Sequence, residues 1–299
     1  MKIAFQMDPI ELVDINADST FRLAEEAQVR GHDIYTYTPN DLTFDRGKIA
    51  AKVRSISLKR KIGEHVNFGT EEMLALSEFD VIWLRQDPPF DMGYITNTHL
   101  LDLVAQETLI VNNPFWVRNL PEKLLVLEFP DLIPDTLISR DLDEIKKFKS
   151  EFNDIIIKPL YGNGGAGVFR LSENDKNLTS LHELFSNISS EPMIAQAFLP
   201  DVKNGDKRII LVDGEPVGAI NRVPKVGETR SNMHVGGIAE SAKLSQRDRE
   251  ICSVIGPTLK SKGQVFVGID VIGEHLTEIN VTSPTGIQEL ERFDEVNIA

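Results

Sequence analysis

The sequence has almost no cysteine and no long apolar run. Cys252 is the one cysteine among 299 residues, so an intrachain disulfide cannot form and a cysteine-rich zinc site is excluded. No apolar stretch approaches the length of a membrane span, and the opening apolar run is too short for a secretory signal. These features predict a soluble cytoplasmic protein that makes no use of a membrane.

Basic residues are in the minority. The chain has 32 Lys and Arg against 46 Asp and Glu, which gives a formal net charge of −14. Proteins that bind nucleic acid along a surface need clustered Lys and Arg to replace the counterions of the phosphates, so this class is excluded. A local basic pocket for a small anion remains compatible with the charge. The length predicts roughly two domains of ordinary size, with one large α/β domain as the alternative.

The pattern of predicted elements changes near Pro121. Before this residue, strands and helices alternate, which predicts an open parallel α/β domain with its ligand crevice at the strand ends. After it, strands follow one another through turns, which predicts an antiparallel α+β region. The predicted strands before Pro121 cover residues 2–7, 33–37, 80–84 and 108–111, and the helices cover 18–30 and 98–106. The later strands cover 154–159, 168–171, 193–198, 207–212, 217–222, 264–272 and 276–281, with a helix over 244–262.

A glycine cluster at residues 162–167 fits the pattern G-x-G-x-x-G. A dinucleotide site needs a helix directly afterwards, but a predicted strand follows here. A glycine loop between two strands can instead act as a flap whose backbone N–H groups approach phosphates. Lys158, on the incoming strand, supports this interpretation, and the alternative is a flexible hairpin tip. No G-x-x-x-x-G-K-[ST] motif is present in the sequence, which excludes a P-loop enzyme.

The hairpin at residues 268–281 brings acidic side chains together. A three-residue turn at 273–275 places Asp270 opposite Glu278, with Asn280 on the same face. Facing carboxylates repel each other. A divalent cation between them would reverse this effect, and three oxygen ligands suit Mg²⁺. The alternative is a solvated strand face with ordinary charges.

Residues 223–237 form an irregular stretch rich in glycine and cationic side chains. Lys225, Arg230 and His234 lie in it, and Arg222 precedes it. In an acidic protein this cluster predicts a mobile lid over an anionic ligand. A disordered surface loop is the alternative. Cys252, within an apolar helix, is interpreted as a packing residue rather than a nucleophile.

Several of these motifs together resemble the ATP-grasp superfamily. They are Lys158, the glycine flap, residues 196–199, residues 206–208 and the set Asp270, Glu278 and Asn280. A closer resemblance is to the bacterial glutathione synthetases. It rests on residues 7–9, 85–91, 122–124, 205–208, 227–230 and 277–285, which lie in the family's order over nearly the whole chain.

The resemblance implies a fold and an activity. The fold is an N-terminal pre-ATP-grasp substrate-binding domain over 1–121 and an ATP-grasp domain over 122–299. The latter has a central lid subdomain at about 122–199 and a C-terminal part at about 200–299 that lacks a terminal helix. The implied reaction joins γ-L-glutamyl-L-cysteine to glycine through an acyl phosphate, with ATP as co-substrate and Mg²⁺, or alternatively Mn²⁺, as cofactor. A cytoplasmic homotetramer is implied as well.

The resemblance also assigns roles to individual residues. Nucleotide-binding residues would be Lys123, Lys158, Gly164, Gly165, Gln196, Ala197, Phe198, Leu199 and Asp206. Arg208, Arg222 and Arg230 would act on substrate carboxylates and the transferred phosphoryl group, and Asp270, Glu278 and Asn280 would hold the metal. Substrates would contact Arg85, Asp87, Ser283, Pro284 and Thr285. Ile238 departs from the family pattern, because some members have a lid arginine there.

Two other functions fit parts of the pattern. One is another ATP-grasp carboxylate–amine ligase, such as a D-alanine–D-alanine-like or amino-acid ligase. The other is a nucleotide-binding module without turnover, although binding alone would not need the whole set of Asp270, Glu278 and Asn280. An acyl-phosphate route needs cationic clamps and a closed lid but no nucleophilic Ser or Cys, which agrees with the residues present.

Overall fold

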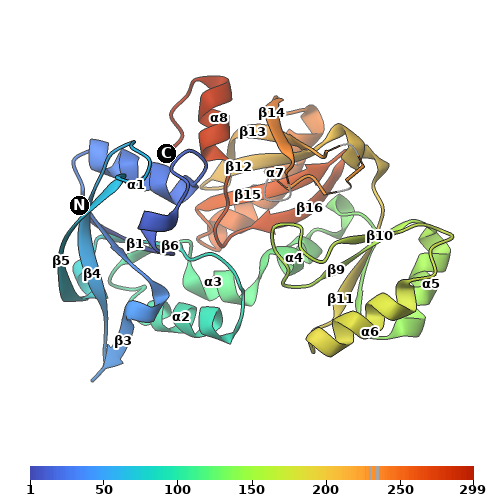
Figure 1. Ribbon diagram of the computed structural model, residues 1–299, viewed down its shortest axis with the longest axis horizontal. Helices are drawn as coiled ribbons and strands as arrows, with labels where there is room; N and C mark the ends of the chain where they lie inside the picture. The colour runs from blue at the N-terminus through green and yellow to red at the C-terminus, as the bar shows by residue number, and fades with distance from the viewer. Residues whose placement is uncertain (226, 229, 233–235) are drawn as a thin grey trace.

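Three sheets, A, B and C, follow one another along the chain (Figure 1). The structure is a computed structural model that describes residues 1–225, 227–228, 230–232 and 236–299. Sheet A is mixed, whereas sheets B and C are antiparallel. The predicted fold class, an open α/β region followed by an α+β region, is confirmed. In the described part of the chain, no helix is both long and apolar enough to cross a membrane.

Sheet A has a parallel centre, in which β1 lies between β2 and β6 and β7 follows at the edge. Asp18 caps the helix after β1, because its side chain accepts a hydrogen bond of 2.6 Å from the Phe21 N–H. The helix predicted over 98–106 begins earlier, where Asp91 caps it. The elements are β1 (Lys2–Met7), α1 (Ser19–Val29), β2 (Asp33–Tyr37), β6 (Val81–Arg85), α2 (Met92–Asp102), β7 (Leu109–Val111), α3 (Pro114–Asn119) and α4 (Glu122–Leu125).

An antiparallel extension of sheet A is a feature that the sequence analysis missed. It consists of β3 (Leu42–Asp45), β4 (Lys48–Leu58) and β5 (Val66–Ala75), and β4 joins it to β2. Along β4 the residues alternate between exposed and buried, which is the period of a half-buried strand. The N-terminal region is therefore α/β with an added antiparallel edge rather than purely parallel.

Sheet B is small and carries helices on one side (Figure 1). It contains β8 (Thr136–Ser139), β9 (Ile155–Pro159), β10 (Phe169–Leu171) and β11 (Met193–Ala197), packed with α5 (Leu142–Phe152) and α6 (Leu178–Ile188) around Ile145 and Ile157. The glycine cluster joins the antiparallel pair β9 and β10. It therefore lies between two strands, as the sequence predicted.

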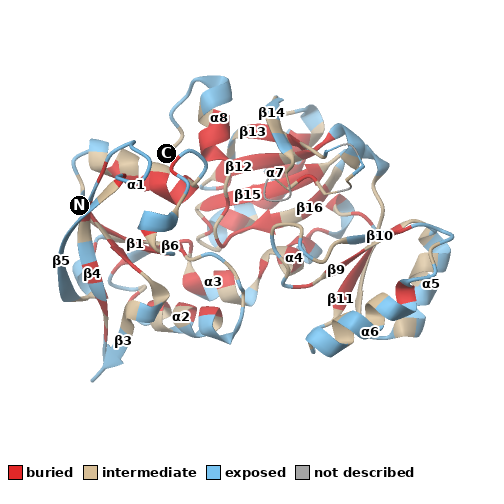
Figure 2. Ribbon diagram, in the orientation of Figure 1, coloured by how far each residue is buried: buried red, intermediate tan, exposed pale blue. Residues whose placement is uncertain are grey.

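Sheet C supplies the most heavily buried strands of the molecule (Figure 2). It contains β12 (Asp206–Val212), β13 (Glu215–Val223), β14 (Ile238–Ala242), β15 (Phe266–Ile272) and β16 (His275–Asn280). One face packs on α7 (Gln246–Ser261) through apolar residues that include Ile209, Ile269 and Ile255. Side chains on the opposite face, such as Arg208 and Asp270, are free of that apolar layer and can form a site.

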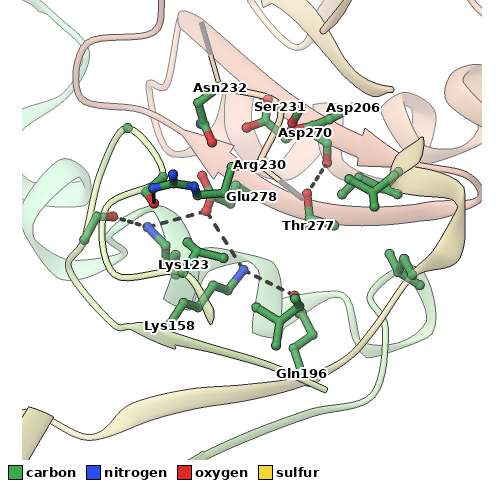
Figure 3. A pocket seen from close by; sticks show the side chains of 18 of the residues that line it. Lys123, Lys158, Gln196, Asp206, Arg230, Ser231, Asn232, Asp270, Thr277 and Glu278 are labelled. Atoms are coloured by element: carbon green, nitrogen blue, oxygen red, sulfur yellow. Dashed lines mark hydrogen bonds and ion pairs between the residues drawn. The ribbon is translucent and has the colours of Figure 1, made fainter. Parts of the chain in front are cut away.

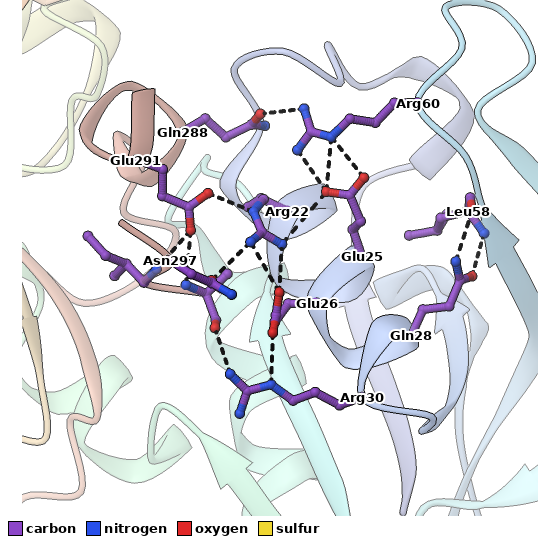
Figure 4. Close-up of polar contacts among 12 residues, drawn as sticks. Arg22, Glu25, Glu26, Gln28, Arg30, Leu58, Arg60, Gln288, Glu291 and Asn297 are labelled. Carbon is purple, nitrogen blue, oxygen red and sulfur yellow. Dashed lines mark hydrogen bonds and ion pairs between the residues drawn. The ribbon is translucent and has the colours of Figure 1, made fainter. Parts of the chain in front are cut away.

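The last helix, α8 (Ile287–Asp294), corrects the expectation that the C-terminal part lacks a terminal helix, and it joins the two ends of the chain (Figure 4). Arg22 on α1 donates from Nε to Glu291 Oε2 at 2.7 Å and forms an ion pair with Glu26 at 3.1 Å. Burial lowers the pKa of Arg22, but these carboxylates outweigh it and the net shift is upward. Arg22 is thus a half-enclosed cation shared by both ends of the chain.

Replacing Arg22 with Met is expected to lower the free energy of unfolding by about 1–3 kcal/mol, since it leaves Glu291 without its charged donor. A denaturant titration would measure the change. The control is Arg54→Met, which breaks the Arg54–Glu71 pair of 3.1 Å whose side chains are 47% and 50% exposed. An exposed pair contributes at most about 1 kcal/mol. Equal losses in the two variants would contradict the role given to Arg22.

Candidate active site

A pocket lined by the predicted glycine loop and hairpin lies between sheets B and C (Figure 3). Its walls are β9, β11, the glycine loop and the hairpin of β15 and β16. The pocket brings together all nine predicted nucleotide residues: Lys123, Lys158, Gly164, Gly165, Gln196, Ala197, Phe198, Leu199 and Asp206.

Two buried lysines converge on one carboxylate in this pocket (Figure 3). Lys123 Nζ, from α4, lies 3.4 Å from Glu278 Oε1, and Lys158 Nζ, from β9, lies 4.0 Å from the same atom. Burial lowers the pKa of Lys158, whereas for Lys123 burial is outweighed by Glu278 and Glu122, which raise its pKa. The pair therefore concentrates positive charge where a phosphate chain could displace the carboxylate.

Asp270 is held by two arginines. Arg208 donates to its two oxygens at 2.5 and 3.0 Å, and Arg222 lies 2.9 Å from Oδ1. Burial alone would raise the pKa of Asp270, but the two guanidinium groups outweigh it and lower the pKa. Arg222 also contacts Asp206 at 2.7 Å. Arg208 and Arg222 are thus buried and connected to the pocket through carboxylates.

The predicted register of the hairpin is confirmed, since Asp270 pairs with Glu278. The turn is tighter than expected, because Ile272 pairs with His275, and an irregularity between Asp270 and Val271 restores the register. The expectation of two bare, repelling carboxylates is wrong: lysines and arginines compensate both of them. The sequence could not show this, because those cations come from other elements.

The donor set suits a hard divalent cation. Asp270 and Glu278 line the pocket, and Asn280 Nδ2 lies 3.4 Å from Asp270 Oδ2, so two carboxylates and one amide meet on adjacent strands. Mg²⁺ favours such oxygen ligands together with phosphate oxygens. Among the described residues, no three His, Cys, Asp or Glu side chains gather at ligand distance. The set therefore needs oxygens from a ligand to complete a coordination shell.

The far end of the pocket is partly apolar. Ile156, Val202 and Ile272 line it beside residues 196–199, and Gln196 is fixed by Thr136 Oγ1 at 2.8 Å and by Lys158 at 3.2 Å. Apolar side chains beside a fixed polar group are the usual lining of a site for a small molecule.

The stretch 223–237 is described only in part. Arg230, Ser231 and Asn232 line the pocket, and Arg230 Nη1 donates to the Gly165 carbonyl at 3.3 Å. Arg230 therefore reaches the glycine loop, which the lid interpretation requires. The predicted lid residue His234 lies outside the described residues, so the lid as a whole remains a prediction.

The predicted substrate residues lie at the boundary with sheet A. Arg85 is buried at the end of β6, where it donates to Thr20 Oγ1 at 3.0 Å and to the Pro284 carbonyl at 2.9 Å. Arg208 Nη1 donates to the Thr285 carbonyl at 3.4 Å. Residues 283–285 are thus held from both sides of the molecule. Asp87 donates its N–H to Asp8 at 3.2 Å.

Several pocket residues had no predicted role. Ser231, Asn232 and Thr277 line the pocket, and beside it the half-buried Glu122 accepts a 2.6 Å hydrogen bond from Thr282 Oγ1. Burial raises the pKa of Glu122. Its position next to Lys123 in the 122–124 motif was the signal that could have identified it.

Cys252 is packed in α7, as predicted, and burial raises the pKa of its thiol to about 12. At pH 8 the thiolate fraction is then on the order of 10⁻⁴, against about a quarter for a free thiol. Labelling of the folded protein by a maleimide is therefore expected to be at least about 10³-fold slower than labelling in denaturant. Comparable rates in the two states would contradict the burial of Cys252.

Comparison with known proteins agrees with this geometry. Residues 1–118 match the model of the prokaryotic glutathione synthetase N-terminal domain, and residues 122–295 match that of the prokaryotic glutathione synthetase ATP-grasp domain. The chain belongs to the prokaryotic glutathione synthetase family. It is 58% identical to the glutathione synthetase of Brucella melitensis and 56% identical to that of Mesorhizobium japonicum, each over 100% of this chain and 96% of the relative. The chain is therefore an ATP-dependent ligase with glutathione synthetase function.

Solved structures agree on the fold. D-cycloserine synthetase DcsG has a TM-score of 0.67 at 14% identity, covering 95% of this chain and 92% of its own. The ATP-grasp ligase PsnB, complexed with minimal precursor, has a TM-score of 0.63 at 18% identity, covering 99% and 95%. At these identities the likeness establishes the ATP-grasp fold, whereas the family matches indicate function.

Proposed function

We propose that the chain joins γ-glutamylcysteine to glycine in the pocket between sheets B and C. The carboxylate of the cysteinyl residue attacks the γ-phosphorus of ATP, ADP leaves, and an acyl phosphate forms. The amine of glycine then attacks the carbonyl carbon, loses a proton and displaces phosphate. The observation that supports this most is the convergence of Lys123 and Lys158 on a pocket lined by the glycine loop.

The roles of the residues follow from charge. When ATP binds, the ammonium groups of Lys123 and Lys158 would contact its phosphates in place of the Glu278 carboxylate. The backbone of Gly164 and Gly165 would cover the phosphates. Residues 196–199 and Asp206 would hold the adenosine part. Arg208, Arg222 and Arg230 would stabilise charge on the transferred phosphoryl group and substrate carboxylates, a contribution that falls steeply with distance.

A divalent cation fits the remaining ligands. Asp270, Glu278 and Asn280 would hold Mg²⁺, with Mn²⁺ as an alternative. When bound, the ion supplies positive charge against the phosphate oxygens. Because both carboxylates are already compensated by cations, the ion would enter with the nucleotide rather than alone.

The two parts of the chain would bind different ligands. Residues 1–121 would bind γ-glutamylcysteine through Arg85 and Asp87, and residues 122–299 would bind ATP. Ser283, Pro284 and Thr285 would border the glycine site, where the two parts meet. The segment 223–237 would close over the ligands, and a cytoplasmic homotetramer is the proposed assembly.

Phosphate release tests this function. With Mg²⁺–ATP, γ-glutamylcysteine and glycine, rapid release of phosphate is expected together with a product of the mass of glutathione. Omission of either γ-glutamylcysteine or glycine should leave only slow ATP hydrolysis. Equal release of phosphate with D-alanine in place of both γ-glutamylcysteine and glycine would instead assign the chain to ligases of the D-alanine–D-alanine type.

A further inference from the structure

Three aromatic rings contact one another in series, from α2 to the start of the glycine loop. The ring centroids of Tyr94 and Phe90 are 5.0 Å apart, and those of Phe90 and Tyr161 are 5.6 Å apart with 23° between the ring planes. Tyr94 is fully buried, whereas Tyr161 is 37% exposed. The series of rings therefore begins at Tyr94 in the hydrophobic core and ends at Tyr161, the residue before Gly162.

The surroundings of this stack are a packed junction rather than a ligand site. The crevice beside Phe90 and Tyr161 holds about 20 Å³ of free volume, which is room for one water molecule. Pro88, Pro121 and Leu160 are among the residues that line it. The crevice therefore has no room for a substrate beside the two rings.

Both of these segments border a proposed ligand. Phe90 lies three positions after Asp87 in the segment assigned to γ-glutamylcysteine, and residues 162–166 line the nucleotide pocket. The glycine loop has positive φ angles at Gly164, Gly165 and Gly167, so its backbone has conformations that other residues rarely adopt. A loop of this composition needs attachments at its ends to hold one conformation.

We propose that the Phe90–Tyr161 stack couples the two sites, so that γ-glutamylcysteine bound beside residues 85–91 holds the glycine loop over the phosphates of ATP. The two rings are positioning residues, because neither of them lines the nucleotide pocket as described. Stacked rings resist sliding and add to the attraction of simple burial. By linkage, nucleotide must strengthen the binding of γ-glutamylcysteine by the same factor. This inference rests on the proposed function.

The test measures how γ-glutamylcysteine changes the affinity for a non-hydrolysable ATP analogue, with Mg²⁺ present and glycine absent. In the parent chain we expect affinity to rise at least about fivefold, the lower end of typical coupling between sites. Tyr161→Phe keeps the ring and should keep this factor. Tyr161→Ala and Phe90→Leu should reduce it below about twofold, and the double variant should lose no more than either single variant.

Phe169→Ala is the matched control. The Phe169 ring is 39% exposed, close to the value for Tyr161, but it contacts Phe185 within the same small sheet unit. Its removal should leave the coupling factor unchanged. Full coupling in Tyr161→Ala, or no coupling in a parent chain that turns over normally, would overturn the inference. Failure of the proposed function would appear separately, as a parent chain that releases no phosphate with γ-glutamylcysteine and glycine.

Discussion

Replacing Glu278 with Gln is expected to lower kcat by about 10²–10³-fold, because the proposed divalent cation, whose positive charge would offset the phosphate oxygens, loses an anionic ligand. The substitution keeps the shape of the side chain but removes the carboxylate that faces Lys123, Lys158 and the proposed metal. Steady-state phosphate release with saturating Mg²⁺–ATP measures the effect. Near-normal turnover would show that Glu278 has only a structural role.

The same substitution should also destabilise the protein without ligands. Two facing carboxylates considered alone predict the opposite sign, because removing one of them would relieve repulsion. In the structure, however, Glu278 is the nearest carboxylate to two buried ammonium groups. Without this charge Lys158 loses its ion pair and Lys123 keeps mainly the attraction of Glu122, which should lower the free energy of unfolding by about 1–3 kcal/mol.

Glu274→Gln provides the control for both measurements. Glu274 lies in the turn of the same hairpin and is exposed, so its charge is far less important to buried groups. We expect its stability to stay within about 0.5 kcal/mol of the parent and its turnover to be unchanged. A loss of stability in both variants would point to the hairpin rather than to the charge of Glu278.

The contrast between Asp270 and its arginines shows what a sequence can predict. The pairing of Asp270 with Glu278 was predicted from a short turn and from the alternation of apolar and polar residues, which are local properties, although in the structure the turn is one residue shorter and an irregularity after Asp270 makes up the difference. The contact with Arg208 depends on the pairing of β12 with β15, whose residues are distant in sequence. Long-range neighbours of this kind are not encoded in any local pattern. The charge balance predicted for the site was therefore wrong.

Strand β5 and helix α8, which the sequence did not predict, also lack a clear local signal. The antiparallel strand β4 shows clear alternation, but its partner β5 is almost wholly exposed and has no apolar face to predict. Helix α8 is short and begins after Gly286, which has a φ of 114° and offers no side-chain cap. Its position is fixed instead by contacts such as Arg22 with Glu291, between opposite ends of the chain.

Replacing Gly165 with Ala is expected to raise KM for ATP by at least about tenfold, equivalent to about 1.4 kcal/mol of binding free energy. Gly165 has a φ of +81°, and a Cβ at this position would lie 2.7 Å from Asn232 Oδ1. The added methyl group would therefore strain the backbone of the glycine loop and displace the Asn232 side chain that packs against it. Phosphates that rely on this loop would lose their backbone donors.

Gly47→Ala separates the strain from the effect on the site. Gly47 has a φ of +84° in the turn between β3 and β4, and a Cβ there would meet nothing within 4 Å. Both substitutions should cost about 1–2 kcal/mol of stability, because alanine is disfavoured in left-handed backbone. Only Gly165→Ala should change KM for ATP. If KM rises equally in both variants, the loss reflects general destabilisation, and if it rises in neither, the glycine loop does not contact the phosphates of ATP.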